Sequence, residues 1–166
     1  MSLEKSLETL KTLHKKFDKK ELNESDTRFQ IIDKILKDTF YWPESNIITE
    51  SITNVGYTDY QLTSNGKTFL VIEAKKEKLN FNFSEYKEIS NNKIKVKVLM
   101  KDKNTEKTIL QVKNYCNDIG CKYACITNGH EWAFFRTYIE NQSWQDGNAY
   151  IIKSLMQSVV NGADGY

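Results

Sequence analysis

The chain has 166 residues, enough for one domain with a sizeable core and too few for two. Hydrophobic residues make up 39% and charged residues 28%, which is typical of a folded soluble protein rather than a disordered or fibrous one. Lysine and arginine total 24 against 22 for aspartate and glutamate, so the formal net charge is only +2. This balance excludes binding to polyanions by bulk charge, and any contact with nucleic acid must depend on local patches.

Absent features narrow the class of protein further. The N-terminus has no apolar signal region, and no run approaches the ~18 apolar residues of a membrane span, which predicts a cytoplasmic protein with no membrane partner. Cys116, Cys121 and Cys125 are an odd number without a CxxC pair, so they are interpreted as reduced thiols rather than zinc ligands. Arg28 and Arg136 are the only arginines, which leaves little capacity for bidentate base reading.

Two helices are predicted at the start of the chain. The first lies within residues 1–22 and extends to about Lys20. It is indicated by side chains that recur at helical spacing: Leu3, Leu7, Leu10, His14 and Phe17. Packing on the domain is its simpler role, and a dimer contact is the alternative. Asn23 or Ser25 can cap the second helix, which ends at Trp42-Pro43. Its expected apolar stripe comprises Phe29, Ile32, Ile35, Leu36 and Phe40.

Three strands are predicted next, at 47–50, 57–63 and 67–75, and the last two form a hairpin around Ser64-Asn65-Gly66. Residues 79–92 lack periodicity and indicate a loop within an insertion at about 78–104. Alternating apolar residues from Ile94 to Val98 then predict a strand with a basic outer face. A solvated surface is the simpler interpretation of its lysines, and a DNA-tracking patch is the alternative: Lys93, Lys95, Lys97, Lys101 and Lys103.

The remainder predicts a helix at 105–119 stopped by Gly120, a hairpin of strands 123–127 and 131–135, and a last helix at about 147–160. The fold class is therefore mixed α/β, a mixed β-sheet flanked by helices in the order α-βββ-α-ββ-α. We expect a single domain over residues 1–166. Its core spans 23–136, and 137–166 form a C-terminal helical extension.

Charged residues at the end of the strand 67–75 indicate a site. Glu73-Ala74-Lys75 follows an apolar run, and burying charges there is unfavourable unless they are paired or bind something. Strand geometry puts Glu73 and Lys75 on one face. Asp59 lies in the partner strand, and two carboxylates beside a lysine form a site suited to Mg²⁺. A simple salt-bridged strand end is the alternative.

The register of the hairpin tests this site. A two-residue turn would pair Asp59 with Ile72 and turn Asp59 and Glu73 to opposite faces. A three-residue loop would pair Asp59 with Val71 and make Asp59 and Glu73 diagonal neighbours, roughly 7–8 Å apart. We therefore expect the three-residue loop or an equivalent bulge.

These residues together resemble the PD-(D/E)xK nuclease superfamily. Asp59 and Glu73-Ala74-Lys75 match its D…(D/E)-x-K signature, with Thr58 where proline is usual. Residues 23–28 resemble the helix that opens the N-terminal nuclease domain of type I restriction endonuclease motor subunits. Gln111 and Tyr115 match the QxxxY motif of that branch, and residues 126–129 with Trp132 resemble its next hairpin. The resemblance covers about residues 23–136 and implies a restriction-endonuclease-like core.

The resemblance also implies roles for individual residues. Asp59, Glu73 and Lys75 would be catalytic, with Lys75 orienting the attacking water. The implied Mg²⁺, for which Mn²⁺ can substitute, would be held by Asp59, Glu73, the Ala74 carbonyl and Glu24. On its own, Glu24 would simply be a first-turn glutamate serving the helix dipole. The residues implied to contact DNA or to support the lysine are Gln111, Tyr115, Arg28 and Lys76, although Arg28 can instead pair with Glu24.

The function implied is Mg²⁺-dependent hydrolysis of DNA phosphodiester bonds in restriction or defence. DNA is the expected partner, together with other restriction-system subunits. A catalytically silent nuclease-like module that binds nucleic acid or a partner protein is the main alternative. An interaction domain that uses the N-terminal leucine helix is the third hypothesis.

Overall fold

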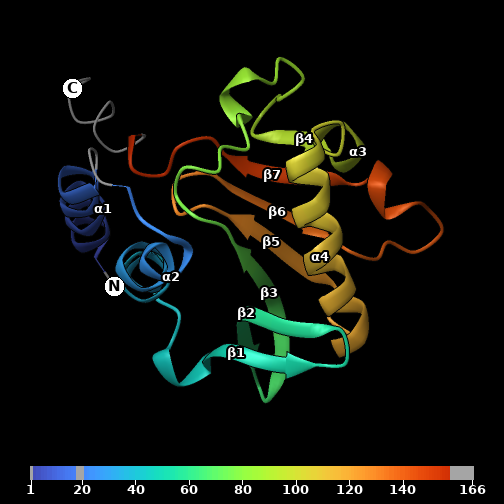
Figure 1. Cartoon of the computed structure of the whole chain (residues 1–166), viewed down its shortest axis with the longest axis horizontal. Helices are drawn as coiled ribbons and strands as arrows, with labels where there is room; N and C mark the ends of the chain where they lie inside the picture. The colour runs from blue at the N-terminus through green and yellow to red at the C-terminus, as the bar shows by residue number, and fades with distance from the viewer. Residues whose placement is uncertain (1, 18–20, 158–166) are drawn as a thin grey trace.

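The computed structural model describes residues 2–17 and 21–157, which surround one mixed β-sheet of seven strands (Figure 1). The spatial order is β1-β2-β3-β5-β6-β7-β4. Strands β3 and β5 are parallel, and the other neighbours are antiparallel. The predicted mixed α/β class is confirmed. The strands are β1 Ile47–Thr53, β2 Gly56–Ser64, β3 Lys67–Ala74, β4 Lys93–Lys95, β5 Tyr123–Thr127, β6 Trp132–Arg136 and β7 Asn148–Ile152.

Helices cover both faces of this sheet, and each face has its own hydrophobic cluster. Helix α4 packs on the face that carries Val71, and the N-terminal helices pack on the face that carries Leu70 and Ile72 (Figure 1). This division follows from strand alternation, because successive side chains point to opposite faces. The helices are α1 Leu3–Phe17, α2 Glu24–Thr27, α3 Val96–Leu99 and α4 Lys103–Ile119, with short 3-10 turns at Glu44–Asn46, Phe83–Glu85 and Trp144–Asp146.

The second helix begins as predicted but winds differently. Asn23 caps it, since its side-chain oxygen accepts a hydrogen bond from the Asp26 amide at 2.8 Å. Beyond α2 the helix continues as two π-helical segments, Arg28–Ile32 and Ile35–Thr39. These wider turns rotate the apolar stripe, because side chains recur at longer intervals than in an α-helix. The predicted stripe is therefore wrong at Phe29, which is 74% exposed.

The β2–β3 hairpin has a tighter turn than the predicted loop. Ser64 pairs with Lys67 across a two-residue turn, whose central residues both have positive φ, 51° at Asn65 and 73° at Gly66. The register then shifts between Leu62 and Thr63. Phe69 is the extra residue of this bulge, since Thr68 pairs with Thr63 and Leu70 with Leu62. The three-residue loop is thus wrong, and the alternative of an equivalent bulge is confirmed.

Two predictions of regular structure after residue 90 are corrected. The strand expected through Val98 ends at Lys95, and Val96–Leu99 is helical, because Val96 and Leu99 both turn into the core beside α4. The helix expected at 147–160 is wrong over Asn148–Ile152, which form β7 between β6 and β4. Alternation of buried Ala149 and Ile151 with outward-facing neighbours is the pattern of this strand. Residues 158–160 lie outside the described residues.

The insertion is tied to the sheet by the buried carboxylate of Glu131. This carboxylate accepts hydrogen bonds from the backbone amides of Phe81 and Phe83, each at 2.8 Å, and from the side chain of Asn128 at 2.9 Å. Both phenylalanines are fully buried in the cluster under α4. Residues 79–92 are therefore irregular, as expected, yet fixed to the core.

The three cysteines are free and buried, in line with the prediction of reduced thiols. Cys116 and Cys121 belong to the cluster beneath α4, and Cys125 to the cluster beneath the N-terminal helices. In the part of the chain that the structure describes, no helix is long and apolar enough to cross a bilayer.

Candidate active site

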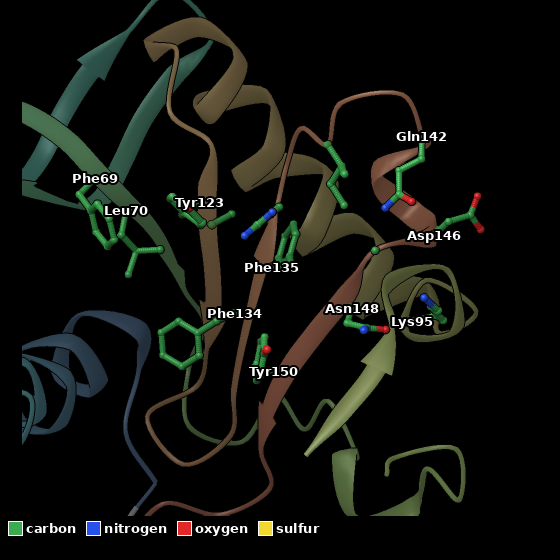
Figure 2. Close-up of a pocket in the computed structure, with 14 residues that line it drawn as sticks. Phe69, Leu70, Lys95, Tyr123, Phe134, Phe135, Gln142, Asp146, Asn148 and Tyr150 are labelled. Atoms are coloured by element: carbon green, nitrogen blue, oxygen red, sulfur yellow. The ribbon is translucent and has the colours of Figure 1, made fainter. Parts of the chain in front are cut away.

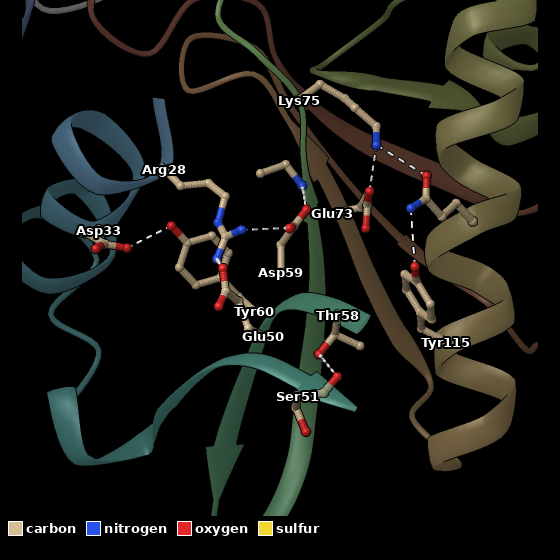
Figure 3. Close-up of polar contacts among 12 residues, drawn as sticks. Arg28, Asp33, Glu50, Ser51, Thr58, Asp59, Tyr60, Glu73, Lys75 and Tyr115 are labelled. Carbon is tan, nitrogen blue, oxygen red and sulfur yellow. Dashed lines mark hydrogen bonds and ion pairs between the residues drawn. The ribbon is translucent and has the colours of Figure 1, made fainter. Parts of the chain in front are cut away.

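The bulge places Asp59 and Glu73 on one face of the sheet. Tyr60 pairs with Ile72, and one step further along this register Asp59 lies opposite Glu73. Opposed residues of an antiparallel pair point to the same face, so the two carboxylates are direct rather than diagonal neighbours. The side chain of Asp59 also anchors the end of β3, because its Oδ2 accepts a hydrogen bond from the Ala74 amide at 2.7 Å (Figure 3).

Lys75 connects the carboxylates to helix α4. Its Nζ lies 2.6 Å from Oε1 of Glu73 and donates to the side-chain oxygen of Gln111 at 3.2 Å. The amide of Gln111 in turn donates to the hydroxyl of Tyr115 at 3.2 Å (Figure 3). Gln111 and Tyr115 lie one turn apart on α4, which allows this relay. Sequence analysis linked Gln111 and Tyr115 either to DNA or to the lysine. Gln111 contacts the lysine directly, and Tyr115, which is buried, contacts only Gln111.

Arg28 joins the site from the second helix. Its guanidinium forms ion pairs with Asp59 at 3.2 Å and with Glu50 at 3.3 Å, rather than with Glu24. The same guanidinium lies over the ring of Tyr60, whose hydroxyl donates to Asp33 at 2.7 Å (Figure 3). Sequence analysis missed this network, since nothing along the chain indicates that Glu50 of β1 approaches Arg28.

The remaining predicted residues lie at the margin. Glu24 is exposed at the start of α2, and its charge acts on both Glu73 and Lys75 without a direct contact. Lys76 is exposed after β3, and its charge acts on Glu21 rather than on the carboxylate pair. The structure thus brings together Asp59, Glu73, Lys75, Gln111, Tyr115 and Arg28.

Burial and mutual repulsion set the charge state of the carboxylate pair. Burial, followed by the negative charge of Asp59, raises the pKa of Glu73 to about 7, although Lys75 opposes this shift. Burial also raises the pKa of Asp59, against the Ala74 hydrogen bond and the charge of Arg28. For Lys75, burial acts to lower the pKa, but the charges of Glu73, Glu24 and Asp59 raise it overall. At neutral pH the site therefore holds a partly protonated Glu73 next to a protonated lysine.

The raised pKa of Glu73 makes the stability of the metal-free protein depend on pH. The pKa of Glu73 is about 7 in the folded state and 4.5 for the unperturbed group. Between these two pH values the folded protein therefore binds more protons than the unfolded protein. Stability should therefore fall as pH rises from about 4.5 to about 7. We expect the free energy of unfolding of Glu73→Gln to rise relative to wild type by about 2 kcal/mol between pH 5 and pH 8.

Urea unfolding in chelator at these two pH values measures that difference. Glu140→Gln, at an exposed position, is the control and should show no such trend. If the wild-type protein instead became more stable relative to Glu73→Gln as pH rises, the inferred burial of Glu73 beside the charge of Asp59 would be contradicted.

The residues present fit a hard divalent cation. Oε2 of Glu73 is buried without a hydrogen-bond partner, which is unfavourable unless it meets a cation. Across the described ranges, no group of three or more His, Cys, Asp or Glu side chains is placed to hold a metal ion. Mg²⁺ does not need such a group, because it keeps several waters and is commonly bound by one or two carboxylates.

Together the fold and this cluster define an α/β domain with two carboxylates on adjacent strands and a lysine directly after one of them. No family model and no curated protein matches the chain. Among solved structures, it is similar to the type IIG restriction endonuclease BpuSI, with a TM-score of 0.41 and 14% sequence identity. The similarity covers 72% of this chain and 12% of that chain, so this chain spans only a small part of that protein's length.

Proposed function

We propose that the domain is a metal-dependent nuclease that hydrolyses DNA phosphodiester bonds. The observation that supports this most is the convergence of Asp59 and Glu73 on facing strands, with Lys75 held over Glu73 by Gln111. Paired acidic ligands beside a cation are suited to phosphoryl chemistry, in which negative charge develops on the transferring group. This proposal is the one that the sequence motifs imply, and it rests on the residues of this chain.

Asp59, Glu73 and the Ala74 carbonyl would hold Mg²⁺, with Glu24 at the margin. The bound ion would polarise the scissile phosphate and lower the pKa of a coordinated water. Glu73 would give up its proton when the cation binds, because a ligand must be ionised. Lys75 would donate hydrogen bonds toward the attacking water or the developing charge on phosphate, and Gln111 would keep its ammonium group in place.

A cleavage assay tests the proposal directly. Plasmid DNA, single-stranded DNA and methylated DNA are incubated with Mg²⁺ or Mn²⁺, and calorimetry measures binding of each metal to the protein. We expect metal-dependent nicking together with calorimetric binding that is lost in Glu73→Ala. Wild-type protein that binds neither metal and nicks no substrate would instead support the silent nuclease-like module.

Gln111 is expected to act as a positioning residue for Lys75. Gln111→Ala removes the oxygen that accepts from Lys75 at 3.2 Å, and we expect cleavage to fall about tenfold because the ammonium group loses its fixed orientation. Gln111→Glu keeps an acceptor for Lys75 and should restore most of the rate. Calorimetric metal affinity should be unchanged in Gln111→Ala, whereas Gln111→Glu adds a negative charge beside Lys75 and should bind the cation at least as tightly. Equal losses in the two variants would mean that Gln111 does not act through the lysine.

A further inference from the structure

A second surface, on the other face of the sheet, carries exposed aromatic rings. Tyr123, Phe134 and Tyr150 point away from the α4 side, where their neighbours Ala124, Phe135 and Ala149 are buried. Phe69, the bulge residue of β3, lies next to them (Figure 2). Tyr150 is 54% exposed, Phe69 48% and Tyr123 37%. We call Phe69, Tyr123, Phe134 and Tyr150 the aromatic platform.

The platform borders a cavity of about 430 Å³ that is open to solvent. Aromatic side chains form one wall, and the chain after β6 closes the other with Gln142 and Asn148, which carry amide groups (Figure 2). A volume of this size matches a ligand pocket with a few polar groups in an apolar lining.

Two of these rings, Phe69 and Tyr123, continue a row that begins at Trp42. Phe69 stacks on Trp42 with ring centroids 6.0 Å apart and planes 22° apart. On its other side the centroid of Tyr123 lies 5.2 Å away, with planes at 31°. The row ends at Tyr123, over which the planar guanidinium of Arg136 lies at 5.8 Å, so a further planar group can extend the stack on this guanidinium or in its place.

Cations surround these rings. Lys93 lies over Tyr150 at 5.1 Å, and Arg136 lies over Tyr123 at 5.8 Å. Lys95 also lines the cavity. The acidic residue in the cavity lining, Asp146, is paired with Lys97 at 2.8 Å. The charge of the platform is therefore positive, which complements a polyanion. An apolar protein segment would leave these cations without a counter-charge.

We propose that the aromatic platform binds single-stranded DNA, with bases stacked on the rings and phosphates held by Arg136 and the lysines. Duplex DNA fits the rings less well, because its bases are already stacked and present only their edges in the grooves. Proteins that hold single strands combine a basic track with aromatic side chains in this way. The platform lies on the face opposite Asp59 and Glu73, so the inference does not depend on cleavage.

Fluorescence anisotropy of a labelled oligothymidylate in chelator tests this inference while hydrolysis is blocked. We expect wild-type protein to bind it, and the double variant Tyr123→Ala/Tyr150→Ala to bind about tenfold or more weakly. Phe29→Ala, which removes a still more exposed ring from the second helix, is the control and should bind like wild type. Lys87→Met, at an exposed lysine of the insertion, should also bind like wild type, which controls for a general loss of positive charge.

Charge and competition provide further readouts. Arg136→Gln should reduce the salt slope of binding by about 0.7, the value for one phosphate contact on a single strand. Unlabelled single strands should compete much better than duplex of the same length. Unchanged binding in the double variant, or a dimer in light scattering that the same substitutions dissociate, would overturn the proposal and assign the platform to a protein contact.

Discussion

Replacing Lys75 by methionine should reduce metal-dependent cleavage by about 100- to 1,000-fold, the usual effect of removing one donor aimed at developing charge. Methionine keeps much of the length and apolar stem of lysine, and the side chain of Lys75 is only 17% exposed, so the packing between β3 and α4 is preserved. What is lost is a cation 2.6 Å from Glu73. Single-turnover nicking of plasmid DNA with saturating Mg²⁺ measures the effect.

The same variant should keep its metal site, which distinguishes it from Glu73→Ala. Calorimetry at pH 8 is the appropriate measurement, because loss of Lys75 removes one of the charges that hold the pKa of Glu73 down. Lys87→Met, at an exposed lysine in the insertion, controls for a general loss of positive charge. Nicking by Lys75→Met at the wild-type rate would remove the lysine from the proposed mechanism.

The grouping of Asp59, Glu73 and Lys75 could be predicted because it depends on short-range rules. Strand periodicity puts Glu73 and Lys75 on one face, and turn chemistry limits the hairpin to a few registers. A register with a bulge is one of these few, but the position of the bulge at Phe69 depends on how β3 packs against its neighbours. The shared face of the carboxylates was therefore predictable, and their direct opposition was not.

Contacts between distant segments could not be predicted in the same way. Arg28 of the second helix reaches Glu50 of β1 across 22 positions of the chain, a contact that neither propensity nor periodicity indicates. Sequence analysis predicts a helix over the residues of β7, because the alternation of Ala149 and Ile151 covers only five residues. Pairing with β6 and β4 makes this segment a strand. Neither Glu50 nor β7 supplies Asp59, Glu73 or Lys75, so the grouping of these three residues was better predicted than the rest of the fold.

Glu131→Ala should reduce the free energy of unfolding by about 2–4 kcal/mol, because buried donors would lose their acceptor. The carboxylate accepts from the amides of Phe81 and Phe83 and from Asn128, and it is 8% exposed, so little water can replace it. For a chain of this length the melting temperature should fall by roughly 4–16 °C. Urea unfolding followed by tryptophan fluorescence measures the change, and Glu140→Ala at an exposed site is the control.

Hydrogen exchange can show which part of the protein is destabilised in Glu131→Ala, in addition to how much stability is lost. If Glu131 fastens the insertion to the sheet, hydrogen exchange in Glu131→Ala should rise first over residues 79–92, before exchange rises in β5 and β6. Glu131→Gln should be partly destabilised as well, since its one amide oxygen cannot accept from both backbone donors as the two carboxylate oxygens do. Uniformly faster exchange across all strands would show that Glu131 supports the whole sheet rather than the attachment of the insertion.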